Sequence, residues 1–198
     1  MEQQHGPHDH IIEPPPSNDA NYKTRGQWLR AAILGANDGL VSTTSLMLGI
    51  SAVRGDARSV AISGIAALAA GASSMAIGEF VSVYTQRDIQ AFERERQGTL
   101  RTINGDKADD PLPNPFRAAT ASALSFMCGA LVPLLCGAFV QNYVARVLAL
   151  VGASSFTLLL FGSLGAHLGG SSIWRASLRV LFGGWLAMAA TYGFLKLF

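Results

Sequence analysis

The sequence predicts an all-α, polytopic integral membrane protein with five transmembrane helices. Of its 198 residues, 49% are hydrophobic and only 14% are charged, whereas an ordinary soluble domain has about 25% charged residues. The charged residues gather in short stretches between long apolar windows, which is the pattern expected of a chain solvated by lipid. These windows lack the alternation of β-barrel strands, so helices must satisfy the backbone.

The segment 1–27 precedes the first window and is polar and rich in proline. It lacks the apolar core of a signal peptide, and we expect a disordered cytosolic tail. His5, His8 and His10 form a short His-rich tract of the kind that can bind metal, although one such tract is more often incidental. The remainder, 28–198, is assigned to one five-helix transmembrane domain.

Five apolar windows are long enough to cross about 30 Å of hydrocarbon as helices. They comprise residues 32–53, 60–84, 118–140, 147–167 and 178–198. A polar stretch at about 86–117 separates the second window from the third, and we expect it to form a short cytosolic linker. Its first half carries charges of both signs and continues the second helix, while its second half is broken by prolines.

Lysine and arginine are distributed unevenly between the segments that flank the windows. With the amino terminus in the cytosol, eleven of them fall on the cytosolic side and four, Arg54, Arg58, Arg146 and Lys196, fall outside. Because positive residues are retained on the cytosolic side, we expect a cytosolic amino terminus and an external carboxyl terminus. The net charge of +2 is too small and scattered to indicate a nucleic-acid partner.

Small residues recur at helical spacing in the first two windows, where they would let two backbones approach closely. This spacing predicts that the first two helices pack against each other as the tight centre of the bundle. The alternative is that the glycines face lipid without a role. The residues concerned are Gly35, Gly39, Ser42, Ser45 and Gly49 in the first window and Gly64, Gly71, Ser74, Gly78 and Ser82 in the second.

Two acidic residues interrupt these windows: Asp38 near the start of the first and Glu79 near the end of the second. Since the two helices run antiparallel, both carboxylates are expected at a similar depth, roughly 7 to 9 Å below the cytosolic boundary. Ionised groups in hydrocarbon are costly and usually face a partner, water or a bundle interior. Neither window contains a Lys or Arg to neutralise them, which favours a functional site over a helix cap or a side chain that reaches the interface.

Met75 lies one turn before Glu79, so its thioether shares a helix face with that carboxylate. Oxygen and sulfur ligands together suit a first-row cation such as ferrous iron better than magnesium or calcium. We therefore predict that Asp38, Met75 and Glu79 bind a transported metal ion, and that the carboxylates take up protons when it leaves. Met47 has no such partner and is interpreted as core packing. No catalytic triad, CxxC pair or phosphate-binding loop has usable context, so we expect neither an enzyme nor a bound cofactor.

Three stretches carry a family resemblance: LRAAILGANDGLVSTTSLMLGI, AAGASSMAIGEFVSVYTQRD and GGWLAMAATYGFLKLF. They resemble the vacuolar iron transporter family, specifically its short nodulin-21-like branch, and the likeness extends in order from Trp28 to Phe198. The resemblance implies a five-span homodimer that exports ferrous iron, or manganese, from the cytosol in exchange for protons along a pathway at the dimer axis. It also implies that Asp38 is the pathway aspartate and Met75 the pathway methionine.

The chain departs from the longer members of that family in two places. They insert a cytosolic helical domain rich in glutamates after the second span, where this chain has only 86–117, and Glu93 and Glu95 are the candidate remnants of its metal-collecting site. They also carry a glutamate in the second span where this chain has Ala67, and Glu79 follows about three turns later. We therefore expect a pathway that is lined differently, with a shifted metal preference.

Two other functions are compatible with the sequence. One is a small dimeric exporter of organic cations, which needs an aromatic-lined cavity for which Phe126, Phe156 and Phe161 could supply rings. The other is a non-transporting membrane scaffold in which the glycine seams only drive assembly. The sequence does not separate iron from manganese. The brevity of the chain and the lack of organellar signals favour a bacterial inner membrane over a vacuolar one.

Overall fold

The computed structural model describes the backbone of residues 19–101 and 112–197, and the side chains of 31–96 and 112–197. This part of the chain forms five helices: α1 (Asp19–Val53), α2 (Ala57–Arg101), α3 (Pro115–Ala138), α4 (Tyr143–Leu168) and α5 (Ile173–Lys196). The predicted all-α class is confirmed. Most of the expected tail at 1–27, with its histidines, lies outside the described residues, as does most of the proline-broken half of the linker, at 102–111.

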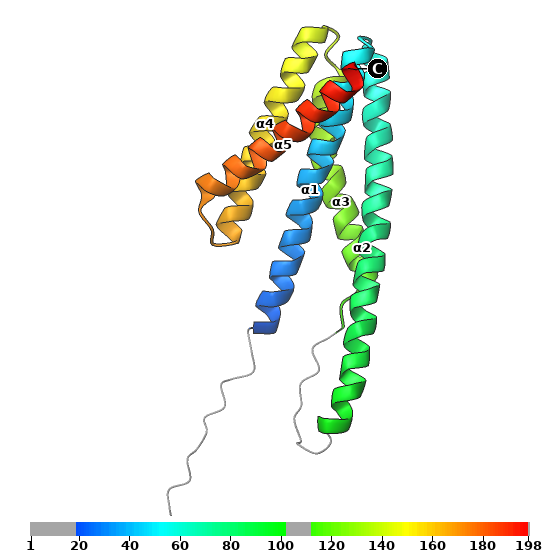
Figure 1. Cartoon of the computed structure of the whole chain (residues 1–198), viewed down its shortest axis with the longest axis vertical. Coiled ribbons are helices and arrows are strands. Elements are labelled where there is room, and N and C mark those ends of the chain that lie inside the picture. The colour runs from blue at the N-terminus through cyan, green and yellow to red at the C-terminus, as the bar shows by residue number, and fades with distance from the viewer. Residues whose placement is uncertain (1–18, 102–111, 198) are drawn as a thin grey trace, which may run out of the picture.

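The helices form a long bundle with a hairpin on one side. Figure 1 shows α1, α2 and α3 running along the long axis, with α4 and α5 packed beside them towards the end where the carboxyl terminus lies. The most extensive contacts join α3 to α1 and to α2, while the hairpin contacts the bundle mainly through α1. The amino-terminal part of α1, the carboxyl-terminal part of α2 and the start of α3 extend beyond the hairpin (Figure 1).

Polar residues at the helix ends fix where the later helices begin. The Oδ1 atom of Asn114 accepts hydrogen bonds from the backbone N–H groups of Phe116 and Arg117, at 3.1 and 3.3 Å, and Pro115 occupies the first turn of α3. Asn142 caps α4 in the same manner. A side-chain oxygen at this position satisfies N–H groups that have no partner within the helix, so the loops between helices can be short.

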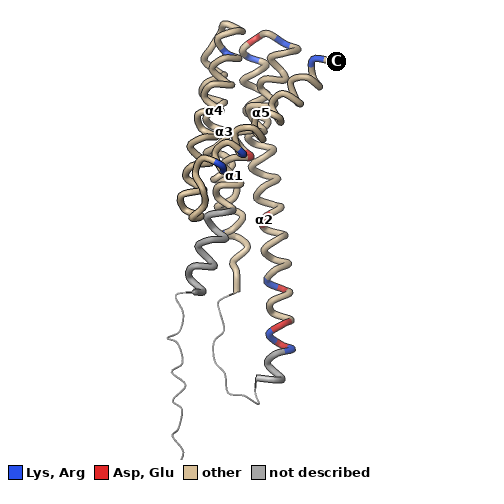
Figure 2. The backbone as a smooth tube through the Cα atoms, turned by 60° about the vertical axis from the view of Figure 1, so that its left-hand side comes forward, with Lys and Arg blue, Asp and Glu red and all other residues tan. Residues whose placement is uncertain are grey.

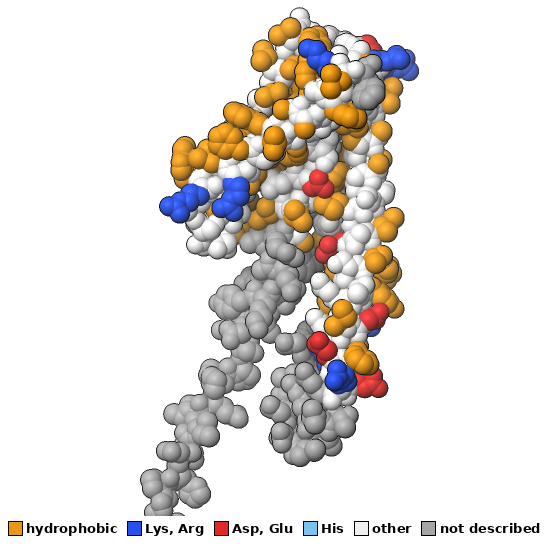
Figure 3. Space-filling view, in the orientation of Figure 1, with side chains coloured by type: hydrophobic (Ala, Val, Ile, Leu, Met, Phe, Trp, Pro, Cys, Tyr) orange, Lys and Arg blue, Asp and Glu red, His pale blue; other side chains and the backbone are white. Residues whose placement is uncertain are grey.

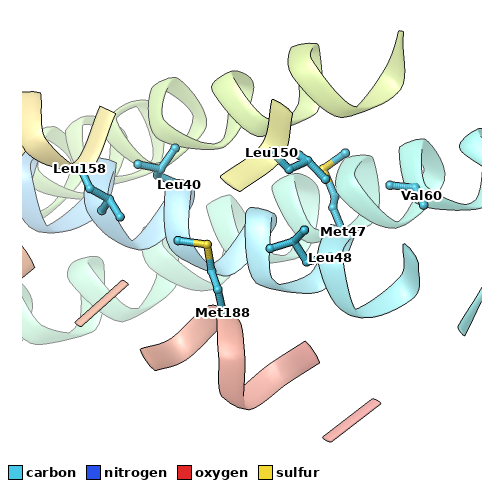
Figure 4. Packing of buried hydrophobic residues seen from close by; sticks show 7 residues of the cluster. All are labelled: Leu40, Met47, Leu48, Val60, Leu150, Leu158 and Met188. Carbon is cyan, nitrogen blue, oxygen red and sulfur yellow. The ribbon is translucent and has the colours of Figure 1, made fainter. Parts of the chain in front are cut away.

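The apolar core is centred on α1. Figure 4 shows Leu40, Met47 and Leu48 of α1 at its centre. The other members of this cluster are Val60 of α2, Leu150 and Leu158 of α4 and Met188 of α5. Met47 is fully buried, which confirms its interpretation as core packing.

The closest helix contact joins α1 to α3. A Cβ atom on Gly39 would lie within 2.8 Å of the carbonyl carbon of Phe126, and a Cβ on Gly129 would lie equally close to that of Ala36. Both helices therefore need glycine where their backbones meet. The helices α1 and α2 do pack against each other, as predicted, but the prediction that they form the tight centre is wrong, because the closest partner of α1 is α3. Gly129 follows Ser125 by four residues in the sequence, a small-residue spacing that the sequence reasoning did not use. The helix α2 instead uses Gly71 to receive the Phe126 ring.

Four of the five helices in the described part of the chain are long and apolar enough to cross a membrane, namely α3, α4, α5 and the part of α2 from Ala57 to Arg96. The helix α1 is not among them because Asn37, Asp38 and a run of hydroxyl residues interrupt its apolar sequence. Large apolar side chains are exposed along the outside of the bundle, as expected of helices that face lipid. Figure 2 shows charged positions at the end where the carboxyl terminus lies and on the lower part of α2, with a few more midway along the bundle. The chain is thus a multi-pass membrane protein.

Candidate metal-binding site

An open groove with a volume of about 730 Å³ runs between α1, α2 and α5, and Phe126 of α3 forms part of its wall. The groove contains all three residues predicted to bind metal: Asp38 from α1, and Met75 and Glu79 from α2. Figure 3 shows acidic side chains midway along the face on which α2 and α5 lie. Both acids line this one groove, but the predicted matched depth is wrong. Asp38 lies 15 residues before the end of α1 and Glu79 lies 22 residues after the start of α2, so their levels along the antiparallel helices differ by about 10 Å.

Asp38 is held by its own helix. The Ser42 hydroxyl, one turn further along α1, donates a hydrogen bond of 2.7 Å to the Oδ1 atom of Asp38. Residues four apart lie on the same helix face, so both side chains enter the groove. This hydrogen bond restricts the rotation of the Asp38 side chain and orients its carboxylate, and it leaves the negative charge in place.

Met75 belongs both to the groove and to the packing beneath it. Its side chain is half-buried against a small cluster of Ala72, Phe126 and Ala130, and the hydroxyl of Ser122 contacts its sulfur at 3.9 Å. Glu79 is also half-buried and follows one turn later on α2. The thioether is thus positioned by α3.

The lining of the groove is electronegative and contains no Lys or Arg. It offers two carboxylates, one thioether and several hydroxyl groups, all of which can ligate a first-row divalent cation. Among the described side chains no three His, Cys, Asp or Glu residues gather closely enough to hold a metal by themselves. Further ligands to a cation in this groove must therefore come from hydroxyls, from Met75 or from water.

The structure adds residues to the site that sequence reasoning did not assign. Ser42, Ser45 and Ser74 were recognised only as small residues, yet they line the groove together with Thr191 of α5. The spacing of Ser42 from Asp38 was a usable signal, whereas Thr191 is joined to the site only by the tertiary fold. Ala67 also lines the groove.

Glu93 and Glu95 lie outside the groove. Both are exposed on the part of α2 that extends beyond Glu79, and about 20 Å of helical rise separates Glu93 from Glu79. Any metal-collecting role for these two residues stays a prediction.

Comparison with known proteins identifies the family. The VIT family model matches residues 29–106 and 99–196. The chain belongs to the VIT family. This is a family of transporters and not of enzymes. The family resemblance and the expectation that the chain is not an enzyme are thus both confirmed.

Several curated plant relatives of this VIT-family chain are similar over most of its length. A vacuolar iron transporter homolog 1 of Oryza sativa subsp. japonica is 57% identical over 178 residues, which cover 90% of this chain and 77% of the relative. A vacuolar iron transporter homolog 3 of Arabidopsis thaliana is 54% identical over 177 residues, covering 89% of this chain and 86% of the relative. The similarity supports metal transport as the general function.

Proposed function

We propose that this VIT-family chain exports ferrous iron or manganese from the cytosol in exchange for protons. The observation that carries the proposal is the single groove that holds Asp38, Met75 and Glu79 without a basic residue in its lining. The names of the plant relatives, which are vacuolar iron transporter homologs, favour iron as the substrate. Manganese accepts the same ligands and is a second substrate of the proposal.

Proton coupling follows from the chemistry of carboxylates in a membrane. A divalent cation favours the ionised form of Asp38 and Glu79, whereas removal of the cation leaves two uncompensated negative charges in one groove. Protons from the opposite compartment relieve that repulsion and lower the affinity for metal. In this mechanism Met75 contributes a soft ligand that discriminates against magnesium and calcium.

We further propose that the working unit is a homodimer with five spans in each chain. The two helices that form the long walls of the groove, α2 and α5, have only 11% of their apolar window buried, against 33% for α3 and 28% for α4. A second copy placed over this face would separate the carboxylates from lipid and create a pathway at the dimer axis. The helix α1 would be the fifth span, because it packs against all four other helices.

The vacuolar membrane is the proposed location, with the amino terminus in the cytosol and the carboxyl terminus outside it. The relatives are named as vacuolar proteins and come from plants, and no finding supports the bacterial inner membrane that the sequence favoured. The orientation rests on the positive-inside distribution of Lys and Arg. Metal leaving the cytosol would then enter the vacuole.

Flux measurements on the reconstituted protein test the proposal. Proteoliposomes should take up Mn²⁺ or anaerobic Fe²⁺ when a pH gradient is imposed, and should release protons in return. Asp38→Asn and Glu79→Gln should each abolish this exchange, whereas Asp88→Asn should not, because Asp88 is an exposed acid on α2 outside the groove. Equal flux in Asp38→Asn and Asp88→Asn protein would contradict the proposed role of the groove.

The same vesicles separate the competing functions. Transport of organic cations would need several aromatic rings in the groove, but of the three candidate phenylalanines only Phe126 lines it, while 64% of Phe156 is exposed on α4. Uptake of ethidium without uptake of metal would favour that reading. A protein that dimerises but moves neither metal nor protons would favour the scaffold.

A further inference from the structure

A second cavity, of about 450 Å³, follows the groove along the same face of α1, α2 and α5. The groove ends at Leu46 of α1 and Thr191 of α5, and the outer cavity begins four residues later on both helices, at Ile50 and Leu195. Figure 1 shows this end of α5 beside the end of α1. A cation that leaves the groove outward must therefore cross about one helical turn that belongs to neither cavity.

The Leu195 side chain covers α1 in this intervening turn. On one face of α1, Ser42 and Ser45 line the groove and Val53 lines the outer cavity, whereas Gly49 continues the same spacing but lines neither. Gly49 is buried, and a Cβ atom at this position would overlap Cδ1 of Leu195 and lie 3.4 Å from its Cγ. The glycine thus provides a seat in which the leucine lies directly on the α1 backbone.

The wall formed by α2 has no comparable obstruction. Small residues line both cavities on this helix at a spacing of four, with Ser59 and Ser63 in the outer cavity and Ala67 and Gly71 in the groove. Residues four apart share a helix face, so short side chains follow one another along α2 past the intervening turn. The interruption between the two cavities therefore comes from the side of α1 and α5, where Leu195 lies.

We propose that Leu195, seated on Gly49, is a hydrophobic gate that separates the carboxylate groove from the outer cavity. This inference rests on the proposed transport function. An apolar constriction excludes water and so stops a hydrated cation, and an exchanger needs such a seal because a path open at both ends would let metal and protons flow independently. Release outward then requires Leu195 to leave its seat on Gly49, since α2 leaves its side of the turn clear.

Leu195→Ala tests the gate because it shortens the side chain that closes the turn. Without a pH gradient, Mn²⁺ should leak down its own gradient into proteoliposomes about fivefold faster or more through Leu195→Ala protein than through wild-type protein. Leu195→Met, which keeps an apolar side chain of similar volume, should restore the seal. The matched control is Leu197→Ala, because Leu197 lies at the same end of the chain, is 86% exposed and lines neither cavity. Equal leak through folded Leu195→Ala and Leu197→Ala proteins would overturn the proposal.

A second measurement does not depend on transport. In a Cys128→Ser, Cys136→Ser background, Ser63→Cys and Ala67→Cys place single thiols on α2 on either side of the gate. A charged methanethiosulfonate, added on the side from which Ser63→Cys reacts, should modify Ala67→Cys about tenfold more slowly or less, and Leu195→Ala should remove this difference. Equal rates at the two thiols with Leu195 in place would show that the path is not closed there. Wild-type protein that moves no metal would instead refute the proposed transport function, and the labelling rates would still decide whether Leu195 closes the path.

Discussion

Replacing Gly39 by alanine is expected to force α1 and α3 apart. The new Cβ would lie 2.8 Å from the carbonyl carbon of Phe126 and 3.0 Å from its Cα, whereas ordinary contact begins at 3.4 Å. These are backbone atoms, so no side chain can rotate away and the helices must separate. Overpacking of this kind costs about 1–3 kcal/mol, and the better helix propensity of alanine returns about 1 kcal/mol. Because the contact is between backbones, the overpacking cost should lie at the upper end of its range, and the free energy of unfolding should fall by a net value of about 2 kcal/mol.

Thermal unfolding of purified protein in detergent, followed by tryptophan fluorescence, measures this loss. For a chain of this size about 2 kcal/mol corresponds to a Tm that is about 4–8 °C lower. Gly129→Ala should lower the Tm by a similar amount, because its Cβ would lie 2.8 Å from the carbonyl carbon of Ala36. Gly152→Ala is the control, since nothing lies within 4 Å of its Cβ position. Equal Tm values for Gly39→Ala and Gly152→Ala would refute the inferred contact.

Three further perturbations test other parts of the structure by the same unfolding assay. Phe126→Ala should cost about 3–5 kcal/mol because a side chain that is only 2% exposed is lost, and Phe126→Leu should cost less. Arg146→Lys should cost about 1.5–3 kcal/mol, since the buried guanidinium bonds to two loop carbonyls at 2.6 and 3.3 Å and an ammonium would lose one of them; an unchanged Tm would contradict this. Hydrogen bonds from Ser59 lower the pKa of Asp56 below 3.8, so its stabilising effect is complete above that value and is lost as the pH falls through the lowered pKa. The Tm difference between wild-type and Asp56→Asn protein should therefore shrink below about pH 4, and a constant difference would argue against this cap.

The helices were predictable because lipid permits few alternatives. A long apolar window in a membrane protein must be helical, and four of the five predicted windows correspond to helices that are apolar enough to span a membrane. The window at 32–53 is also helical, but its polar residues place it at the centre of the bundle. Its closest contact partner was not predictable, because both the second and the third windows carry small residues at helical spacing, such as Gly71 and Gly78 in one and Ser125 and Gly129 in the other.

Part of the candidate site could be found from helix geometry alone. Asp38, Met75 and Glu79 were singled out by depth and by helix face, which depend only on local spacing, and they line one groove. Thr191 was missed because its proximity to α1 is a property of the tertiary fold. Metal binding by these residues stays a prediction.

The charge along the face between α1, α2 and α5 changes sign from one end to the other. The inner end holds Asp38 and Glu79, the middle is neutral, and a second cavity of about 450 Å³ at the outer end is lined by Arg54. A divalent cation is therefore most stable at the carboxylates and meets a rising electrostatic energy towards the exit. Protonation of the carboxylates removes the attraction that holds the ion. In the proposed mechanism protons would drive release against this gradient, which is the physical reason for proposing an exchanger rather than a channel.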